Sequence, residues 1–172
     1  MAYCIEAELS NRAQAVVDVL RRSGLSVITA ESCTAGLLAA ALSHGTEASA
    51  CLHGGFAVYT KAQKSASLGV DQSLLQSQGS VNAEVARQMA EGALRRSQAN
   101  VAVAITGVFG PTPDEDNNQP GIVYVAVARS GRPTEVVRHD FGKLEPDQVR
   151  KATVLNALDL LLHTVQSSVA ES

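Results

Sequence analysis

The sequence is poor in aromatic residues, in cysteine and in long apolar runs. Its 172 residues include no Trp, three Tyr, three Phe and three Cys, and aromatic residues make up 3% of the chain. A binding site built from several stacked rings is therefore excluded. The longest apolar runs, such as 101–105 and 160–162, fall far short of the ~20 residues that a membrane span needs. We expect no membrane partner.

An excess of positive charge is also missing. The 14 Lys and Arg residues stand against 17 Asp and Glu, for a net charge of −3, which argues against a generally basic nucleic-acid binder. The chain starts with acidic residues and shows no secretory signal pattern. The cysteines at positions 4, 33 and 51 are odd in number and lack CxxC spacing. They indicate reduced thiols and a cytoplasmic protein.

Metal-ligand spacing is not found either. The four histidines show neither an HExxH motif nor paired spacing, so surface or loop positions are the simpler interpretation. The sequence therefore predicts no metal site and no cofactor.

The apolar residues that are present follow a helical period and a strand period. Helices are predicted over 6–23, 34–42, 61–68, 72–78, 83–97 and 145–165, and strands over 25–30, 51–59, 101–106, 122–128 and 134–141. Helices and strands alternate first, then two strands form a hairpin, and a helix closes the chain. This order predicts an α/β fold in one domain, 1–172: a three-layer α/β/α sandwich around a mixed, mainly parallel sheet.

The first of three unusual segments, 30–36, reads Ala-Glu-Ser-Cys-Thr-Ala-Gly and lies between a strand and a helix. A serine at such a turn can act as a nucleophile beside backbone N–H groups that hold an oxyanion. The simpler alternative is that Ser32 or Thr34 only caps the helix. Cys33 is the second candidate nucleophile, although a reactive cysteine usually needs a neighbouring histidine.

The second segment runs from Gly54 to Lys64. Paired glycines in a strand indicate a bulge or a close backbone approach, and Tyr59 stands at the end of that strand. Lys64 lies one turn into the next helix, where a surface charge is the common interpretation. In a partly dry pocket beside a serine, however, a lysine loses proton affinity and can act as a base. The Tyr–Lys gap of five residues excludes the short-chain dehydrogenases, which need a gap of four on one helix face.

The third segment, 106–111, reads Thr-Gly-Val-Phe-Gly-Pro and ends the most apolar strand. Glycines at this place let backbone N–H groups approach a ligand. The spacing matches neither GxGxxG nor GxxxxGK[ST], so the dinucleotide fingerprint and the Walker motif are excluded. Alone, the segment is more typical of a turn.

Together, the three segments resemble one family, the C-terminal domain of the competence/damage-inducible CinA proteins. Pro120-Gly121, Leu68-Gly-Val70, the stretch 89–93 and Val149-Arg150 fit the same pattern, so the resemblance covers about 27–162. Stand-alone members act as nicotinamide mononucleotide deamidase (nicotinamide-nucleotide amidase), which hydrolyses the carboxamide to nicotinate mononucleotide and ammonia. The resemblance implies an α/β/α sandwich, a mononucleotide substrate and a homo-oligomer.

The resemblance also implies catalytic roles for Ser32, Tyr59 and Lys64. The substrate-binding residues that we expect are Glu31, Cys33, Thr34, Gly36, Gly55, Thr106, Gly107, Phe109, Gly110 and Arg150. Backbone N–H groups of the 32–36 turn are expected to hold the oxyanion.

This sequence departs from the family pattern at several of these positions. Ala35 stands in place of a glycine, Thr60-Lys61 in place of Ser-Asn, and Phe109 in place of a small residue. The segment 141–146 replaces a Gly-Asp-Arg sequence, which removes an arginine suited to phosphate, and Lys143 or Arg150 are the candidates to compensate. The departures leave two alternatives open, a non-catalytic nucleotide-binding or regulatory domain and an amidase for another small amide.

Overall fold

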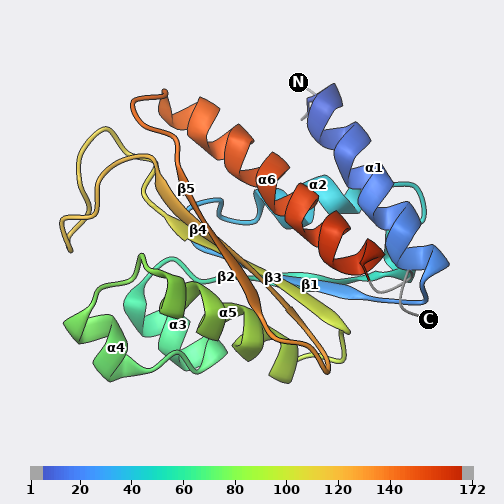
Figure 1. The fold of residues 1–172 in the computed structure, drawn as a ribbon, viewed down its shortest axis with the longest axis horizontal. Helices are drawn as coiled ribbons and strands as arrows, with labels where there is room; N and C mark the ends of the chain where they lie inside the picture. Colours follow the sequence, from blue (N-terminus) through green and yellow to red (C-terminus); the bar gives the residue numbers. More distant parts are fainter. Residues whose placement is uncertain (1–5, 168–172) are drawn as a thin grey trace.

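The computed structural model describes residues 6–167, which fold into one five-stranded sheet with helices on both sides (Figure 1). The helices are α1 (Ala7–Arg22), α2 (Leu37–Ser43), α3 (Lys61–Leu68), α4 (Gln72–Ser77), α5 (Ala83–Arg95) and α6 (Pro146–Gln166), with a 3₁₀ helix at Ala48–Ala50. The strands are β1 (Val27–Glu31), β2 (Leu52–Ala57), β3 (Val101–Gly107), β4 (Ile122–Arg129) and β5 (Glu135–Asp140). Cys4 lies outside the described residues.

The strand order in the sheet is β2-β1-β3-β4-β5. Strand β1 pairs in parallel with β2 and β3, whereas the β3–β4 and β4–β5 pairs are antiparallel. Since β5 again runs in the direction of β3, four of the five strands point the same way. The predicted three-layer sandwich with a mixed, mainly parallel sheet is confirmed, and so is the hairpin of the last two strands.

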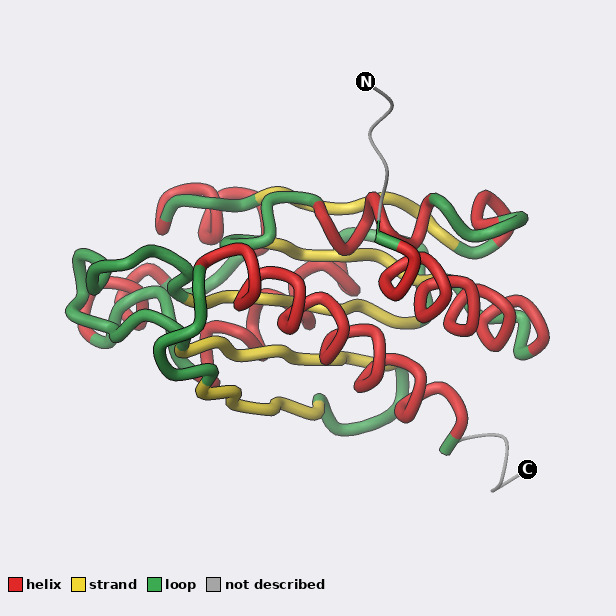
Figure 2. The backbone as a smooth tube through the Cα atoms, turned by 90° about the horizontal axis from the view of Figure 1, so that it is seen from above, coloured by secondary structure: helices red, strands yellow, loops and turns green. Residues whose placement is uncertain are grey.

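The two faces of the sheet have different side chains, because residues alternate between faces along each strand. Valine and isoleucine from β3 and β4 face α1, α2 and α6, whereas alanines from the same strands face α3, α4 and α5. Figure 2, which views the molecule from above, shows α6 lying across the strands. The alanine face lets α5 lie close to the sheet, and Gly92 of α5 abuts α3, since a Cβ there would meet Leu68 O at 2.0 Å.

Two predicted boundaries differ in a way that bears on function. The helix expected from 34 begins only at Leu37, because Ala35 and Gly36 adopt left-handed conformations with φ of 50° and 101°. Neither Ser32 nor Thr34 caps it: the N-cap residue is Gly36, which makes no side-chain cap bond. The bulge indicated by the paired glycines is present, since the β1–β2 register shifts after Val27. The 3₁₀ helix was not predicted.

The carboxyl ends of β1, β2 and β3 meet at one edge of the sheet, which is where open α/β sheets bind ligands. Ser32 N donates to Ile105 O at 3.0 Å, and Val58 N donates to Glu31 O at 2.8 Å. These bonds hold together the three segments that the sequence singled out. Within the described part of the chain, no helix is long and apolar enough to cross a membrane.

Candidate active site

Lys64 and Ser32 form a buried pair at the carboxyl edge of the sheet. Lys64 is the third residue after the start of α3, and its Nζ donates to Ser32 Oγ at 2.9 Å. The lysine is 1% exposed and the serine 7%. The two residues are 32 positions apart in the sequence, so only the fold brings them into contact.

Two backbone carbonyls complete the environment of the Lys64 amine. Its Nζ lies 3.3 Å from Val58 O and 3.3 Å from Tyr59 O. A neutral amine has two N–H groups and one lone pair, so the two carbonyls can take the N–H groups while the lone pair points at the Ser32 hydroxyl. Burial lowers the pKa of Lys64 from 10.5 to about 8, which makes this neutral form accessible near neutral pH.

Cys33 is not suited to the nucleophilic role that the sequence left open for it. Its thiol is buried, and burial raises the pKa of Cys33 to about 12. The thiol therefore stays protonated in the physiological range, whereas thiolate is the reactive form. The base contacts Ser32 instead. The geometry favours the serine.

The turn after Ser32 offers two backbone donors. Ala35 N donates to Ser32 O at 3.0 Å, and Gly36 N donates to the Glu31 carboxylate at 3.1 Å. Among residues 6–167, the N–H groups of Cys33 and Thr34 donate to no backbone oxygen, and the Cys33 sulfur is the group that they approach. Adjacent N–H groups next to a nucleophile can stabilise a developing oxyanion. This agrees with the oxyanion site expected at 32–36.

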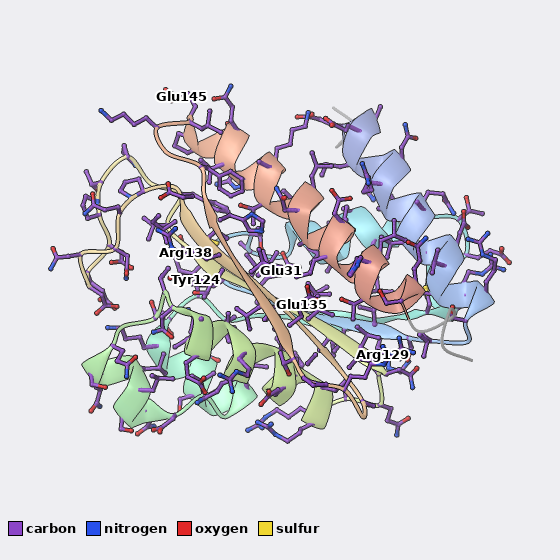
Figure 3. The ribbon with its side chains drawn as sticks, in the orientation of Figure 1. Glu31, Tyr124, Arg129, Glu135, Arg138 and Glu145 are labelled. Atoms are coloured by element: carbon purple, nitrogen blue, oxygen red, sulfur yellow. The ribbon has the colours of Figure 1, made fainter. Side chains whose placement is uncertain are left out.

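Glu31 has a structural task in place of the expected substrate contact. Its side chain is 1% exposed and lies in the interior of the molecule (Figure 3). The carboxylate accepts bonds from the backbone N–H groups of Gly36, Leu38 and Ala39 at 2.9–3.1 Å and from the Thr29 hydroxyl at 3.0 Å. Glu31 therefore caps α2 from the end of β1 and fixes the turn that carries Ser32.

Gly55 also supports this cap and does not line the site. It pairs with Thr29 in the sheet, and a Cβ at Gly55 would lie 2.3 Å from the Thr29 hydroxyl oxygen. That hydroxyl is the one that donates to Glu31. The glycine is required because any side chain would displace Thr29. The structure thus gives Gly55 a packing role, and its expected contact with substrate stays a prediction.

A cavity of about 580 Å³ opens in front of Ser32, a volume typical of small-molecule sites. Six of the expected site residues besides Ser32 line it: Cys33, Tyr59, Gly107, Phe109, Gly110 and Arg150. Four more lining residues, Thr60, Lys61, Val108 and Pro111, lie within the segments singled out from the sequence but were not named as site residues. The sequence did not indicate Ser80, Val81, Asp114, Glu115 and Pro146. Most of these belong to loops whose path no local motif specifies.

A second hollow of about 520 Å³ adjoins the first and shares Cys33, Tyr59 and Arg150 with it. Thr34 and Gly36 line this second hollow. The Thr34 hydroxyl is buried without a partner in the described structure. The expected residues of the 32–36 turn therefore divide between two connected hollows.

Arg150 and Lys61 are cations that line the cavity, and Arg150 is the one that the sequence predicted. Its guanidinium lies 5.8 Å from the centroid of the Phe109 ring and 3.1 Å from Asp147, and it borders both hollows. Phe109 is 8% exposed and supports the guanidinium through a cation–π contact. Lys143, the other candidate for compensation, does not line the first cavity but a neighbouring pocket, which shares Phe109, Gly110, Pro111 and Pro146 with it.

The phenol of Tyr59 does not lie where a proton relay between Ser32 and Lys64 would need it. Its side chain is 71% exposed, and its contact with Lys64 is made by the backbone carbonyl. Among the described residues, the phenol hydroxyl makes no hydrogen bond with Ser32 or Lys64. The ring borders both hollows, so a contact with a bound ligand is the role that the geometry allows.

Thr106 does not line the cavity either. It is fully buried, and its hydroxyl donates to Ser80 O at 2.8 Å. Thr106 therefore holds the wall residue Ser80 and acts on the site only through it. Within residues 6–167, no three His, Cys, Asp or Glu side chains come together as a metal site.

The fold and the buried pair define an α/β domain with a serine and a lysine at the carboxyl edge of a mixed sheet. The chain belongs to the CinA C-terminal domain family, whose model matches residues 9–165. A CinA-like protein of Geobacter sulfurreducens is 38% identical over 148 residues, which cover 86% of this chain and 35% of that protein. A CinA-like protein of Anaeromyxobacter sp. is 42% identical over 146 residues, 85% of this chain and 35% of that protein.

Solved structures agree with this assignment. The competence/damage inducible protein CihA from Agrobacterium tumefaciens superposes with a TM-score of 0.89 at 36% identity, over 93% of this chain and 97% of that chain. A CinA superfamily protein from Escherichia coli gives a TM-score of 0.86 at 32% identity, over 94% and 93% of the two chains. The chain spans about a third of the length of the curated relatives named above, at 35% of each, but nearly all of these two solved chains.

Proposed function

We propose that this domain hydrolyses the carboxamide of nicotinamide mononucleotide to nicotinate mononucleotide and ammonia. The observation that carries the proposal is the buried contact of 2.9 Å between Lys64 Nζ and Ser32 Oγ. A serine beside a lysine whose pKa is lowered to about 8 is an activated nucleophile suited to acyl transfer. Family membership supplies the choice of amide.

In the proposed reaction, neutral Lys64 removes the proton from the Ser32 hydroxyl while Oγ bonds to the amide carbon. The carbonyl oxygen becomes an oxyanion, which the N–H groups of Cys33 and Thr34 stabilise. Collapse of this intermediate breaks the carbon–nitrogen bond, and the Lys64 ammonium gives its proton to the leaving nitrogen, which departs as ammonia. Water then attacks the ester, with Lys64 again accepting a proton, and releases the acid and free Ser32.

The remaining cavity residues are assigned to the nucleotide part of the substrate. Arg150 is suited to the phosphate, because a guanidinium offers several donors in one plane. The ring of Tyr59 and the 107–110 loop border the space between Arg150 and Ser32. The proposal includes a homo-oligomer, which light scattering at several protein concentrations tests.

The test is ammonia release from nicotinamide mononucleotide by the purified protein and by Ser32→Ala. We expect the variant to lose activity by about 10²–10⁴-fold, since it removes the attacking group. Ser43→Ala, in an exposed position at the end of α2, is the matched control and should retain wild-type activity. Near-full activity of Ser32→Ala would overturn the assignment of the nucleophile. Loss of activity on adding a chelator would contradict a reaction without metal.

A second candidate function is a nucleotide-binding or regulatory domain without turnover. It is favoured by the exposed Tyr59 phenol and by the Phe109 side chain beside Arg150. Calorimetry separates the two: binding of the mononucleotide with no release of ammonia supports this second function. A panel of small amides distinguishes an amidase with another substrate.

A further inference from the structure

One side chain outside the reacting pair joins three segments of the cavity wall. The Asp116 carboxylate contacts Lys61 Nζ at 2.5 Å through Oδ1 and the Ser80 backbone N–H at 3.1 Å through Oδ2. Lys61 also lies 3.3 Å from Glu115. The three segments, which are the start of α3, the stretch before α5 and the loop after β3, are far apart in the sequence.

This junction is closely packed. Gly79 has φ of +76°, and a Cβ there would lie 2.7 Å from the Asp116 carboxyl carbon. Ser80 is held from both sides, since Asp116 accepts its N–H and Thr106 donates to its carbonyl at 2.8 Å. Ser80, Lys61 and Glu115 all line the cavity in front of Ser32. Asp116 therefore fixes the wall that faces the nucleophile.

The junction also bears on the base. Lys61 precedes Lys64 by three positions on α3, a spacing that places side chains next to each other on a helix. The charged or titratable groups that act directly on Lys64 are Cys33 from the turn after β1, Glu115 from the loop after β3, and Lys61 from α3 itself, whereas Asp116 is linked to it through Lys61. In the described structure, α4 and α5 add no charged group to this set.

We propose that Asp116 is a positioning residue of the site, which locks the cavity wall to α3 and offsets the charge of Lys61 beside Lys64. The inference rests on the proposed function for its catalytic meaning but concerns an electrostatic property of the folded chain. It also explains how a lysine is tolerated at position 61, one turn before the base.

The proposal makes opposite predictions for the two partners. Asp116→Asn keeps an acceptor for Ser80 but removes the negative charge, so Lys61 disfavours the ammonium form of Lys64 and its pKa falls. Lys61→Met removes the positive charge and leaves two carboxylates, so the pKa of Lys64 rises. In the double variant the two changes cancel. A purely structural role would not move the two single variants in opposite directions.

The direct test is an NMR titration with ¹³C-labelled lysine side chains. The chain has four lysines, and Lys61→Met, Lys143→Arg and Lys151→Arg identify the other signals. We expect the Lys64 midpoint to move down by about half a unit in Asp116→Asn, up by a similar amount in Lys61→Met, and back in the double variant. Asp159→Asn removes an exposed ion pair with Arg12 on α1 and should leave the midpoint unchanged.

A second readout follows ammonia release against pH in the same variants. Below the Lys64 midpoint, the neutral fraction of Lys64 should be about threefold larger in Asp116→Asn than in the wild type, because half a pKa unit is a factor of about three. When each rate is divided by the same protein's rate well above the midpoint, the variant should therefore release ammonia about threefold faster than the wild type. Unchanged Lys64 midpoints in both single variants would overturn the inference. If the wild-type protein releases no ammonia while the NMR midpoints move as described, the proposed function fails and the electrostatic role of Asp116 stands.

Discussion

Glu31 and Lys64 are both charged residues that the fold buries to 1% exposure, but their surroundings differ. Four donors surround the Glu31 carboxylate, three of them backbone N–H groups at the start of α2. Lys64 has one hydroxyl and two carbonyls as partners, and no carboxylate among residues 6–167 forms an ion pair with it.

The difference separates a structural charge from a reactive one. A carboxylate that accepts bonds from several donors is held in a fixed geometry. A buried ammonium without an opposite charge is held at a cost, so its proton is released more easily. Both groups act on Ser32: Glu31 fixes the backbone that carries the nucleophile, and Lys64 contacts its hydroxyl.

The largest effect on activity is expected for Lys64→Met, which roughly keeps the length of the side chain and removes the amine. Ammonia release should fall by about 10²–10⁴-fold, because the general base is lost. The free energy of unfolding at pH 7 should stay equal or rise, since an apolar side chain replaces a buried charge.

The pH dependence of stability checks the same variant. The pKa of Lys64 is lowered from 10.5 to about 8, so between these values the unfolded chain binds a proton that the folded chain lacks. Wild-type stability therefore gains from this group as pH rises from about 8 to 10.5, and Lys64→Met should lack that gain. Urea unfolding at several pH values measures it, and parallel curves would contradict the lowered pKa.

Glu31→Ala should show the reverse pattern, with a large effect on stability. The substitution leaves three backbone N–H groups, one buried and two part-buried, and a buried hydroxyl without their acceptor, and we expect a loss of about 3 kcal/mol in the free energy of unfolding. Urea unfolding measures it. Glu8→Ala, at an exposed position of α1, is the control and should change stability by less than about 0.5 kcal/mol. A Glu31 variant as stable as this control would show that the cap is dispensable.

Gly55→Ala tests the Glu31 cap indirectly, through the Thr29 hydroxyl. The added methyl would lie 2.3 Å from the Thr29 hydroxyl that donates to Glu31, so we expect a loss of about 2 kcal/mol. Thermal or urea unfolding measures it. Gly110→Ala, where the nearest atom is 3.8 Å away, should leave stability nearly unchanged. If Thr29→Ala combined with Gly55→Ala costs the sum of the single losses, the steric explanation is wrong.

The smallest effect is expected for Tyr59→Phe. The phenol is exposed and the contact with Lys64 comes from the backbone, so the variant keeps the geometry of the base. We expect kcat to fall less than about tenfold, with the change mainly in KM, as for one lost hydrogen bond to substrate. Steady-state kinetics decide it, and a loss in kcat as large as that of Lys64→Met would restore the relay role.

Much of the architecture follows from sequence patterns, because the periods of 3.6 and 2 are local. The order of strands and helices, the last hairpin and the bulge at Gly54 are of this kind. The start of α2 was misplaced since its cap is Glu31, which lies outside the usual N-cap position. The pattern that marks a cap in the sequence is a residue next to the helix, not one at the end of the preceding strand.

The candidate site could be predicted only in part for a related reason. Ser32 stood out at a strand end, Lys64 stood out in the first turn of the helix after a strand, and both belong to family motifs. The wall residue Ser80 and Asp116, which binds it, carry no such signal, since their position depends on bonds between distant loops. The expected roles of Glu31, Gly55 and Thr106 assumed that residues near the motif face the ligand, whereas the structure uses them to hold its neighbours.

The alanine face of the sheet affects how far the Lys64 amine extends toward Ser32. Small side chains on β3 and β4 let α5 lie close to the sheet, and Gly92 lets α3 lie against α5. Lys64 projects from α3, so the thickness of this layer sets how far its amine extends toward Ser32. Bulky side chains in the layer would move α3 outward and leave the amine short of the hydroxyl. The small alanine side chains on this face are thus a condition for the contact between base and nucleophile.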